Sequence, residues 1–121
     1  MKRAGIVRVG IAGWTYAGWR GSFYPKALPH SRELAFASRK VDTIEINGTH
    51  YSLQRPKSFA NWHDQTPNGF IFAVKGSRFI THLKQLRDVE AALANFLCLR
   101  GVAPWGKTRP FSVAILTPFW F

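Results

Sequence analysis

The sequence of 121 residues predicts a parallel α/β fold, and three of its features support this prediction. Short runs rich in β-branched residues have the pattern of buried strands, and the segments between them have the pattern of helices. The order along the chain is strand, loop, helix, strand, helix, strand, helix. Helical crossovers of this length join parallel strands, which gives either a β/α barrel or an open, doubly wound sheet. Three such units leave a parallel edge unpaired, so the pattern indicates the beginning of a larger domain.

The first unit begins with a strand at residues 7–14, which we expect to be buried because it is short, β-branched and closed by glycine. Residues 15–29 form a long loop, and its aromatic side chains indicate an ordered segment rather than a linker. Ser31 has the side chain of a good N-cap, so we expect a helix from there to about Arg39.

The second and third units follow the same plan. We expect a strand at 41–47 and then a helix at 56–65, whose first residue is a proline. The Pro-Asn-Gly sequence at 67–69 is a strong turn signal, and it leads into a third strand at 70–75. Asp88 or a neighbour begins the last helix.

The last segment, residues 98–121, does not continue this pattern. Residues 98–110 show neither a helical nor a strand period, and the sequence ends in an apolar, aromatic stretch. One interpretation is an irregular C-terminal tail. The interpretation that we favour is a frameshift of one base near codon 98. One permitted shifted reading gives the end of a helix, a glycine turn and a further strand that includes Gly-Pro-Phe-Leu-Trp-Gln.

Composition narrows the class of protein. Apolar residues make up 46% of the sequence and aromatic residues 15%, which is typical of a globular chain. No stretch reaches the roughly 18 consecutive apolar residues of a membrane helix, and the N-terminus lacks the apolar core of a signal peptide. We therefore expect a cytoplasmic protein without a membrane partner. The single cysteine, Cys98, excludes an internal disulfide and agrees with a reducing compartment.

The formal net charge of +11 favours anionic partners such as nucleic acid or phosphorylated metabolites. Residues 1–97 carry 14 basic and 6 acidic side chains, so a net charge of +8 lies outside the tail. The basic residues are spread along the chain without a run of five or six. A solvated basic surface, or a fragment that lacks an acidic second half, therefore remains an alternative explanation.

Four blocks of sequence occur in order along the chain. They are Val-Gly-Ile-Ala-Gly-Trp at 9–14, Trp-Arg-Gly-Ser-Phe-Tyr-Pro at 19–25, Thr-Ile-Glu-Ile-Asn-Gly-Thr-His-Tyr at 43–51 and Phe-Ile-Phe-Ala-Val-Lys-Gly-Ser-Arg-Phe-Ile-Thr-His at 70–82. Together they resemble the YecE-like family, domain of unknown function 72, over about residues 7–97.

The resemblance implies a TIM-type β/α barrel that is incomplete here, with about the first three β/α units only. It assigns residues 1–97 to the N-terminal part of the barrel domain and leaves residues 98–121 as the frameshifted or irregular tail. The biochemical function of the family is unassigned. Gly48 and His50 depart from the family pattern, in which we expect serine and phenylalanine or a similar residue.

Candidate site residues follow from the position of active sites in such barrels, at the carboxyl ends of the strands. Glu45 lies within an apolar strand and needs a cation or hydrogen-bond donors if it points inward. Lys75 ends the next strand and is its natural partner, so the pair either performs acid–base and electrostatic chemistry or fixes the barrel interior. We predict three catalytic candidates, Glu45, Lys75 and His82, and five substrate-binding candidates, Trp14, Tyr16, Asn47, Tyr51 and Arg78.

The histidines and the aromatic loop have plainer alternatives. His82 is either an acid–base residue or an ordinary hydrogen-bonding side chain, and we expect His30, His50 and His63 to be incidental. No HxH spacing occurs, and we predict no metal site, and the cofactor is unknown. The aromatic residues of the loop either stack on bases or sugars or pack as a plug at one barrel end.

Three functional hypotheses remain open. The intact barrel is an enzyme that acts on an anionic or sugar-like substrate, or it is a nucleic-acid-binding protein, as the charge allows. The third hypothesis is that the chain is a fragment without a function, because three units cannot close a barrel. The oligomeric state stays open.

Overall fold

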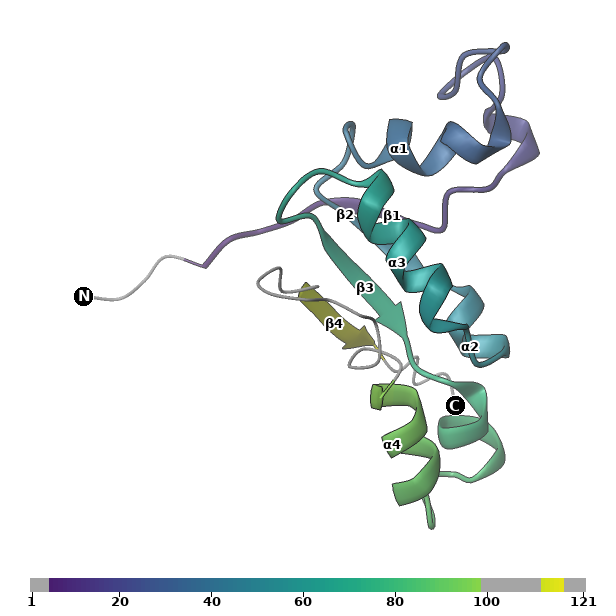
Figure 1. Ribbon diagram of the computed structural model, residues 1–121, viewed down its shortest axis with the longest axis vertical. Coiled ribbons are helices and arrows are strands. Elements are labelled where there is room, and N and C mark those ends of the chain that lie inside the picture. The colour runs from purple at the N-terminus through teal and green to yellow at the C-terminus, as the bar shows by residue number, and fades with distance from the viewer. Residues whose placement is uncertain (1–4, 99–111, 117–121) are drawn as a thin grey trace.

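The computed structural model describes residues 5–98 and 112–116, and it shows a mixed α/β chain built on a parallel sheet (Figure 1). The strands are β1 (Gly10–Ala12), β2 (Thr43–Ile46), β3 (Ile71–Lys75) and β4 (Ser112–Leu116). Their order in the sheet is β1-β2-β3-β4, and every neighbouring pair is parallel. The predicted parallel α/β class is therefore confirmed, and its strands lie side by side in the order of the sequence.

Helical segments connect the strands. The connection from β2 to β3 contains α3, which has the predicted bounds and places Pro56 in its first turn, where the missing amide hydrogen costs nothing. After β3 the chain forms a π-helical turn, η3, where the sequence suggested only a loop. The helical segments are η1 (Ala17–Trp19), η2 (His30–Arg32), α1 (Glu33–Ala37), α2 (Gly48–Tyr51), α3 (Pro56–Gln65), η3 (Phe79–Leu83) and α4 (Glu90–Cys98).

The core lies between the sheet and the layer of α1 and α3. Alternate residues of β2 and β3 are buried, as expected for strands whose side chains point to opposite faces in turn. Burial of a side chain as large as Phe72 stabilises the fold by roughly 1.5–3 kcal/mol. The buried apolar side chains that form this core are Tyr24, Leu34, Ala37, Ile44, Ile46, Phe72, Val74, Ile80 and Phe96.

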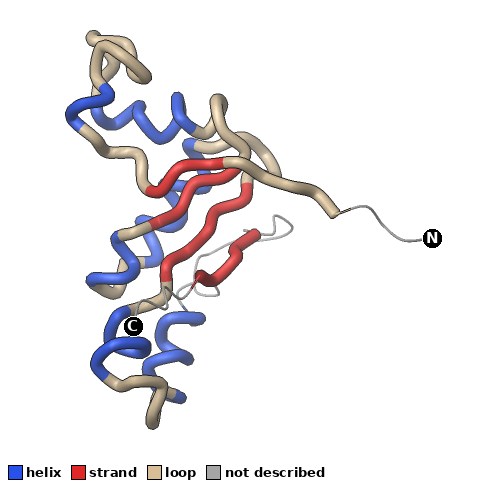
Figure 2. The backbone as a smooth tube through the Cα atoms, turned by 180° about the vertical axis from the view of Figure 1, so that it is seen from behind, coloured by secondary structure: helices blue, strands red, loops and turns tan. Residues whose placement is uncertain are grey.

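The opposite face of the sheet is visible in Figure 2, on the far side of the strands from α1 and α3. The other set of alternate side chains lies there, and on β2 and β3 they are only half-buried. Glu45 and Lys75 belong to this set. The register pairs Glu45 with Ala73, so Lys75 is one diagonal step further along β3.

The first strand differs from the prediction. Only Gly10–Ala12 forms a strand, none of residues 7–14 is buried, and Val7 and Val9 are 87% and 69% exposed, so the expected strand at 7–14 is wrong at both ends and in its burial. The physical reason is that β1 is the edge strand of the described sheet and has β2 on one side only. Gly10 allows a close approach there, since a Cβ atom at this position would lie 2.0 Å from the Thr43 carbonyl oxygen.

Ser31 is not the N-cap of the first helix. It lies inside the 3₁₀ turn η2, and α1 begins two residues later at Glu33 with no side-chain cap. The amide of Arg32 donates to the Pro29 carbonyl oxygen at 2.9 Å, so a backbone hydrogen bond closes this turn before the helix starts. The prediction for this helix is therefore wrong at its N-terminal boundary.

The C-terminal segment holds one strand that the sequence did not suggest. β4 pairs with β3 over five residues, from Ser112 beside Ile71 to Leu116 beside Lys75. The interpretation of 98–121 as a frameshifted or irregular tail stays a prediction. Residues 99–111 and 117–121 lie outside the described residues. Among the described helices, none is long and apolar enough to cross a membrane.

Candidate functional site at the carboxyl ends of the strands

The carboxyl ends of β1 and β2 lie next to each other and lead into the loops that form the site. Gly13, directly after β1, has a φ of +74°, a conformation that glycine adopts without a steric penalty. Its amide donates to the Glu45 carbonyl oxygen at 2.9 Å, so the two strands stay paired up to the point where the chain turns. The side chains that follow the two strands therefore face a common space.

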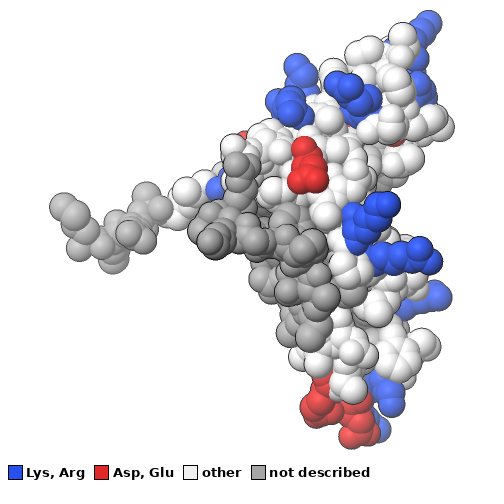
Figure 3. Space-filling model, viewed as in Figure 1, with Lys and Arg blue, Asp and Glu red and all other residues white. Residues whose placement is uncertain are grey.

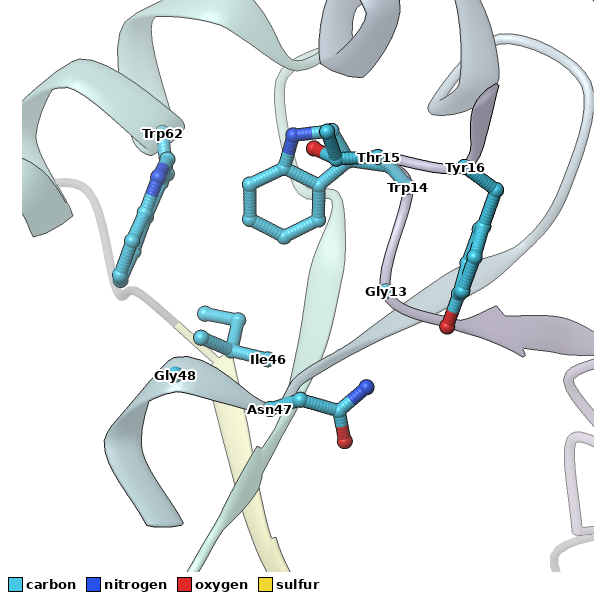
Figure 4. Close-up of a pocket in the computed structure, with 8 residues that line it drawn as sticks. All are labelled: Gly13, Trp14, Thr15, Tyr16, Ile46, Asn47, Gly48 and Trp62. Carbon is cyan, nitrogen blue, oxygen red and sulfur yellow. The ribbon is translucent and has the colours of Figure 1, made fainter. Parts of the chain in front are cut away.

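That space is a cavity of about 330 Å³. Figure 4 shows the indole rings of Trp14 and Trp62 at its side, with Ile46 below them. The two indoles meet edge to face, with their centroids 5.9 Å apart. None of the lining residues carries a charge, and the polar groups come from Thr15, Tyr16 and Asn47. The lining residues are Gly13, Trp14, Thr15, Tyr16, Ile46, Asn47, Gly48 and Trp62.

Residues of the aromatic loop hold parts of the cavity lining in place. The buried Tyr24 donates its hydroxyl to the Trp14 carbonyl oxygen at 2.6 Å, which fixes the backbone of a lining residue. The Tyr16 ring contacts Trp19 at 4.5 Å between centroids with the ring planes tilted by 45°, and its hydroxyl donates to the Ala12 carbonyl oxygen. Burial, with smaller contributions from the negative charge of Glu33 and from Tyr16, raises the pKa of Tyr24 to about 12.

An ion-pair group that the sequence did not reveal holds this loop to α1. Glu33 is 1% exposed, and its Oε1 accepts hydrogen bonds from Arg20 Nη1 at 2.8 Å and His30 Nδ1 at 2.9 Å. Arg20 also donates to the Leu28 carbonyl oxygen. A buried carboxylate is stable only when it is paired. Through Glu33, these contacts link Arg20 in the aromatic loop to His30 and to α1.

Asn47 is the polar residue of the cavity with an incomplete set of partners. Its Oδ1 is buried and has no hydrogen-bond partner in the described part of the chain. Its Nδ2 lies beside Gly13, at 3.2 Å from the position of a Cβ atom there. A buried amide oxygen without a partner costs roughly 1–3 kcal/mol, and because the atom is buried, the side chain must rotate before a donor on a ligand can reach it.

A second group of side chains lies beyond the cavity, at the carboxyl ends of β2 and β3. We name His50, Tyr51, Arg78 and His82 the His–Arg cluster. The ring of His50 contacts that of Tyr51 at 5.1 Å and that of His82 at 5.3 Å between centroids. The Arg78 guanidinium lies over Tyr51, 5.6 Å from the ring centroid.

Hydrogen bonds orient both imidazoles of the cluster. His50 Nδ1 lies 2.8 Å from the Gly76 carbonyl oxygen, and because a carbonyl only accepts, this nitrogen carries the hydrogen. His82 Nδ1 lies 2.7 Å from Thr81 Oγ1. In each ring the Nε2 atom is therefore the nitrogen left for a ligand.

The structure divides the predicted site residues into three groups. Trp14, Tyr16 and Asn47 line the cavity, whereas Tyr51, Arg78 and His82 belong to the His–Arg cluster. Glu45 and Lys75 belong to neither, and their catalytic roles stay predictions.

The expected ion pair between Glu45 and Lys75 is not formed, since the ion pairs found among the described residues involve only Glu33 and Asp64. The register explains this, because Glu45 lies beside Ala73 rather than beside Lys75.

Sequence reasoning missed several residues of the site: Trp62 and His50, and the lining residues Gly13, Thr15, Ile46 and Gly48. Trp62 lines the cavity from α3, and only the packing of α3 on the sheet places it there. His50 was expected to be incidental, although its position directly after a strand end was a usable signal. His30 and His63 each pair with a nearby carboxylate, Glu33 and Asp64 respectively. Within the described ranges, no group of three or more His, Cys, Asp or Glu side chains comes together as a metal site would require.

The described residues thus define a parallel α/β protein with an aromatic cavity at the carboxyl edge of its sheet. The chain belongs to the family described as protein of unknown function DUF72, whose model matches residues 8–117. The predicted resemblance to the YecE-like family is therefore confirmed.

Two curated relatives are similar to parts of the chain. It is 26% identical over 76 residues to the UPF0759 protein YunF of Bacillus subtilis, covering 63% of this chain and 26% of the relative. It is 26% identical over 92 residues to the UPF0759 protein YecE of Escherichia coli K12, covering 76% of this chain and 31% of the relative. The matched region thus spans about a quarter to a third of the length of these relatives. No solved structure matches the chain.

Proposed function

We propose that the chain forms the first part of a TIM-type β/α barrel, and that the family's intact protein is an enzyme acting on a sugar-like substrate. The strand order supports the barrel. Doubly wound sheets reverse their strand order at a switch point, whereas barrel strands follow one another in sequence. Here the order is sequential, and α1 and α3 cover the same face of the sheet (Figure 1).

The cavity carries the proposal for the substrate. Two indole side chains, an amide with an unpartnered oxygen and no charged lining residue fit a neutral ring that bears hydroxyl groups. The apolar C–H face of a sugar packs on an aromatic ring, and its hydroxyls supply the donor that Asn47 lacks. Of the anionic and sugar-like substrates that the sequence allows, the cavity therefore favours the sugar-like class.

Glu45 is the candidate for acid–base chemistry in this enzyme. It lies on β2 two residues before Asn47, and its side chain lies on the sheet face that would be the interior of a barrel. A carboxylate in such a position can accept a proton from a substrate hydroxyl or water. The other strands of the barrel would supply its partner groups.

A nucleic-acid-binding function is the second candidate, and the charge distribution favours it. Lys and Arg side chains lie along one edge of the molecule, from the end with α1 past α3 and α2, whereas acidic side chains show at the end with α4 and at one central place (Figure 3). Binding through this surface would weaken steeply with added salt, because phosphate contacts release counterions. Binding of a neutral sugar would not change with salt.

Saturation-transfer NMR of the chain with a panel of neutral monosaccharides tests the proposed substrate class. We expect transfer to ring C–H protons, at least about fivefold weaker binding for Asn47→Ala, and no transfer for Trp62→Leu. Phe70→Leu is the matched control, because this aromatic residue directly precedes β3, at the opposite edge of the sheet from the cavity. Absence of transfer from every sugar, or undiminished transfer in Trp62→Leu, would refute the proposal.

A further inference from the structure

The His–Arg cluster adjoins the cavity along the chain. Gly48 lines the cavity and begins α2, and His50 and Tyr51 follow in the same four residues. A helix rises about 1.5 Å per residue, so the backbone of His50 lies roughly 3 Å along the axis from that of Gly48. A ligand that extends from the cavity past Gly48 along α2 would reach the cluster.

The open hydrogen-bonding groups of the cluster are donors or become donors on protonation. Arg78 is exposed with its guanidinium over the Tyr51 ring, and its N–H groups donate no hydrogen bond within the described part of the chain, so they can serve a ligand. The hydrogen bond from His50 Nδ1 to Gly76 leaves Nε2, which gains a hydrogen when the ring is protonated. His82 presents its Nε2 in the same way.

No acidic side chain balances these groups. Within the described residues, no carboxylate forms an ion pair with Arg78, Lys75, His50 or His82. The carboxylates of Glu33 and Asp64 pair elsewhere, and Asp42 accepts from the amide of Val9. A group of cationic or protonatable side chains without a counter-charge attracts an anion, and a planar guanidinium matches an oxyanion with several acceptor oxygens.

We propose that the cavity and the His–Arg cluster together bind a phosphorylated sugar, with the ring against Trp14 and Trp62 and the phosphate on His50, Arg78 and His82. This inference rests on the proposed function for the ring and adds an anion site for the phosphate. It reconciles the uncharged cavity with the basic sequence, because the charge of the ligand lies outside the cavity.

Calorimetric titration of the chain with three probes separates the two parts of the inference. The probes are a free hexose, inorganic phosphate and a hexose 6-phosphate. We expect the hexose phosphate to bind about tenfold or more tightly than the free hexose, which is the size of a charge-assisted hydrogen bond. Arg78→Gln and the double variant His50→Gln, His82→Gln should lose this advantage and bind inorganic phosphate about tenfold more weakly, while the affinity for free hexose stays unchanged.

Arg32→Gln is the matched control, because it removes one exposed positive charge from η2, away from the cluster. Equal affinity of the two hexoses, or unchanged phosphate binding in Arg78→Gln, would overturn the anion site and leave the sugar cavity standing. Binding of inorganic phosphate without binding of either hexose would overturn the phosphorylated sugar as ligand and the proposed function with it. If a single-stranded oligonucleotide binds through Arg78 and the hexose phosphate does not bind, the His–Arg cluster is a nucleic-acid-binding site and the inference is wrong.

Discussion

Replacement of Tyr24 by phenylalanine should change both the stability of the fold and its dependence on pH. Tyr24 is fully buried, and its hydroxyl donates to the Trp14 carbonyl oxygen at 2.6 Å. Loss of this hydrogen bond should cost about 1 kcal/mol of unfolding free energy near pH 8, where both proteins are uncharged at this position. The same loss releases the backbone of a residue that lines the cavity.

The pH dependence follows from the raised pKa. Burial, assisted by Glu33 and Tyr16, raises the pKa of Tyr24 from 10.0 to about 12 in the folded chain. The folded state thus holds the phenolic proton more tightly than the unfolded state does. This contribution to stability is fully present below pH 10 and is lost as the pH rises through the range from 10 to about 12. The complete loss amounts to about 3 kcal/mol, of which about 1.4 kcal/mol is lost by pH 11.

The measurement is urea unfolding of the wild-type chain and of Tyr24→Phe at several values between pH 8 and pH 11. Groups that both proteins share cancel in the difference. The advantage of the wild type, about 1 kcal/mol at pH 8, should vanish between pH 10 and pH 11. A difference that stays constant over this range would refute the argument, because it would show that Tyr24 ionises equally easily in the folded and unfolded chains.

Two further substitutions test the fold that supports the site. Gly10→Val should abolish the pairing of β1 with β2, because its Cβ would lie 2.0 Å from the Thr43 carbonyl oxygen, and amide hydrogen exchange at Gly13 should rise with it; unchanged exchange there contradicts this prediction. Glu33→Gln removes the buried charge that pairs with Arg20 and His30, so it should lower the unfolding free energy by roughly 2–4 kcal/mol at pH 7. A loss below about 0.5 kcal/mol in urea unfolding would show that the ion pairs do not hold the aromatic loop.

Sequence reasoning succeeded where local signals agree. The helix Pro56–Gln65 has a proline at its start and a Pro-Asn-Gly turn after it, and the structure places both boundaries as predicted. Gly69 adopts a φ of +77°, as that turn requires. β3 begins one residue later than expected. Each of these features depends on a few consecutive residues, so no knowledge of the tertiary fold was needed.

Features that depend on packing could not be predicted in this way. Val7 and Val9 have the residue types of a buried strand, and only their place at the sheet edge leaves them exposed. Glu45 and Lys75 both lie at strand ends, and the expected ion pair depends on a register that no local pattern reveals. The contact between His50 and His82 joins side chains 32 positions apart in the sequence, through the parallel pairing of β2 with β3.

The position of the cavity within the chain decides which parts of the proposal this chain can test. All lining residues lie between Gly13 and Trp62, so β1, β2 and α3 suffice to build the cavity. Ligand binding there should therefore be measurable on these 121 residues. Catalysis would also require partner groups for Glu45. Its half-buried carboxylate lies on the face of the sheet opposite α1 and α3, where a barrel would bring further strands. Binding without turnover is therefore the outcome that agrees with the geometry for this chain, and turnover is to be sought in relatives about three to four times its matched length.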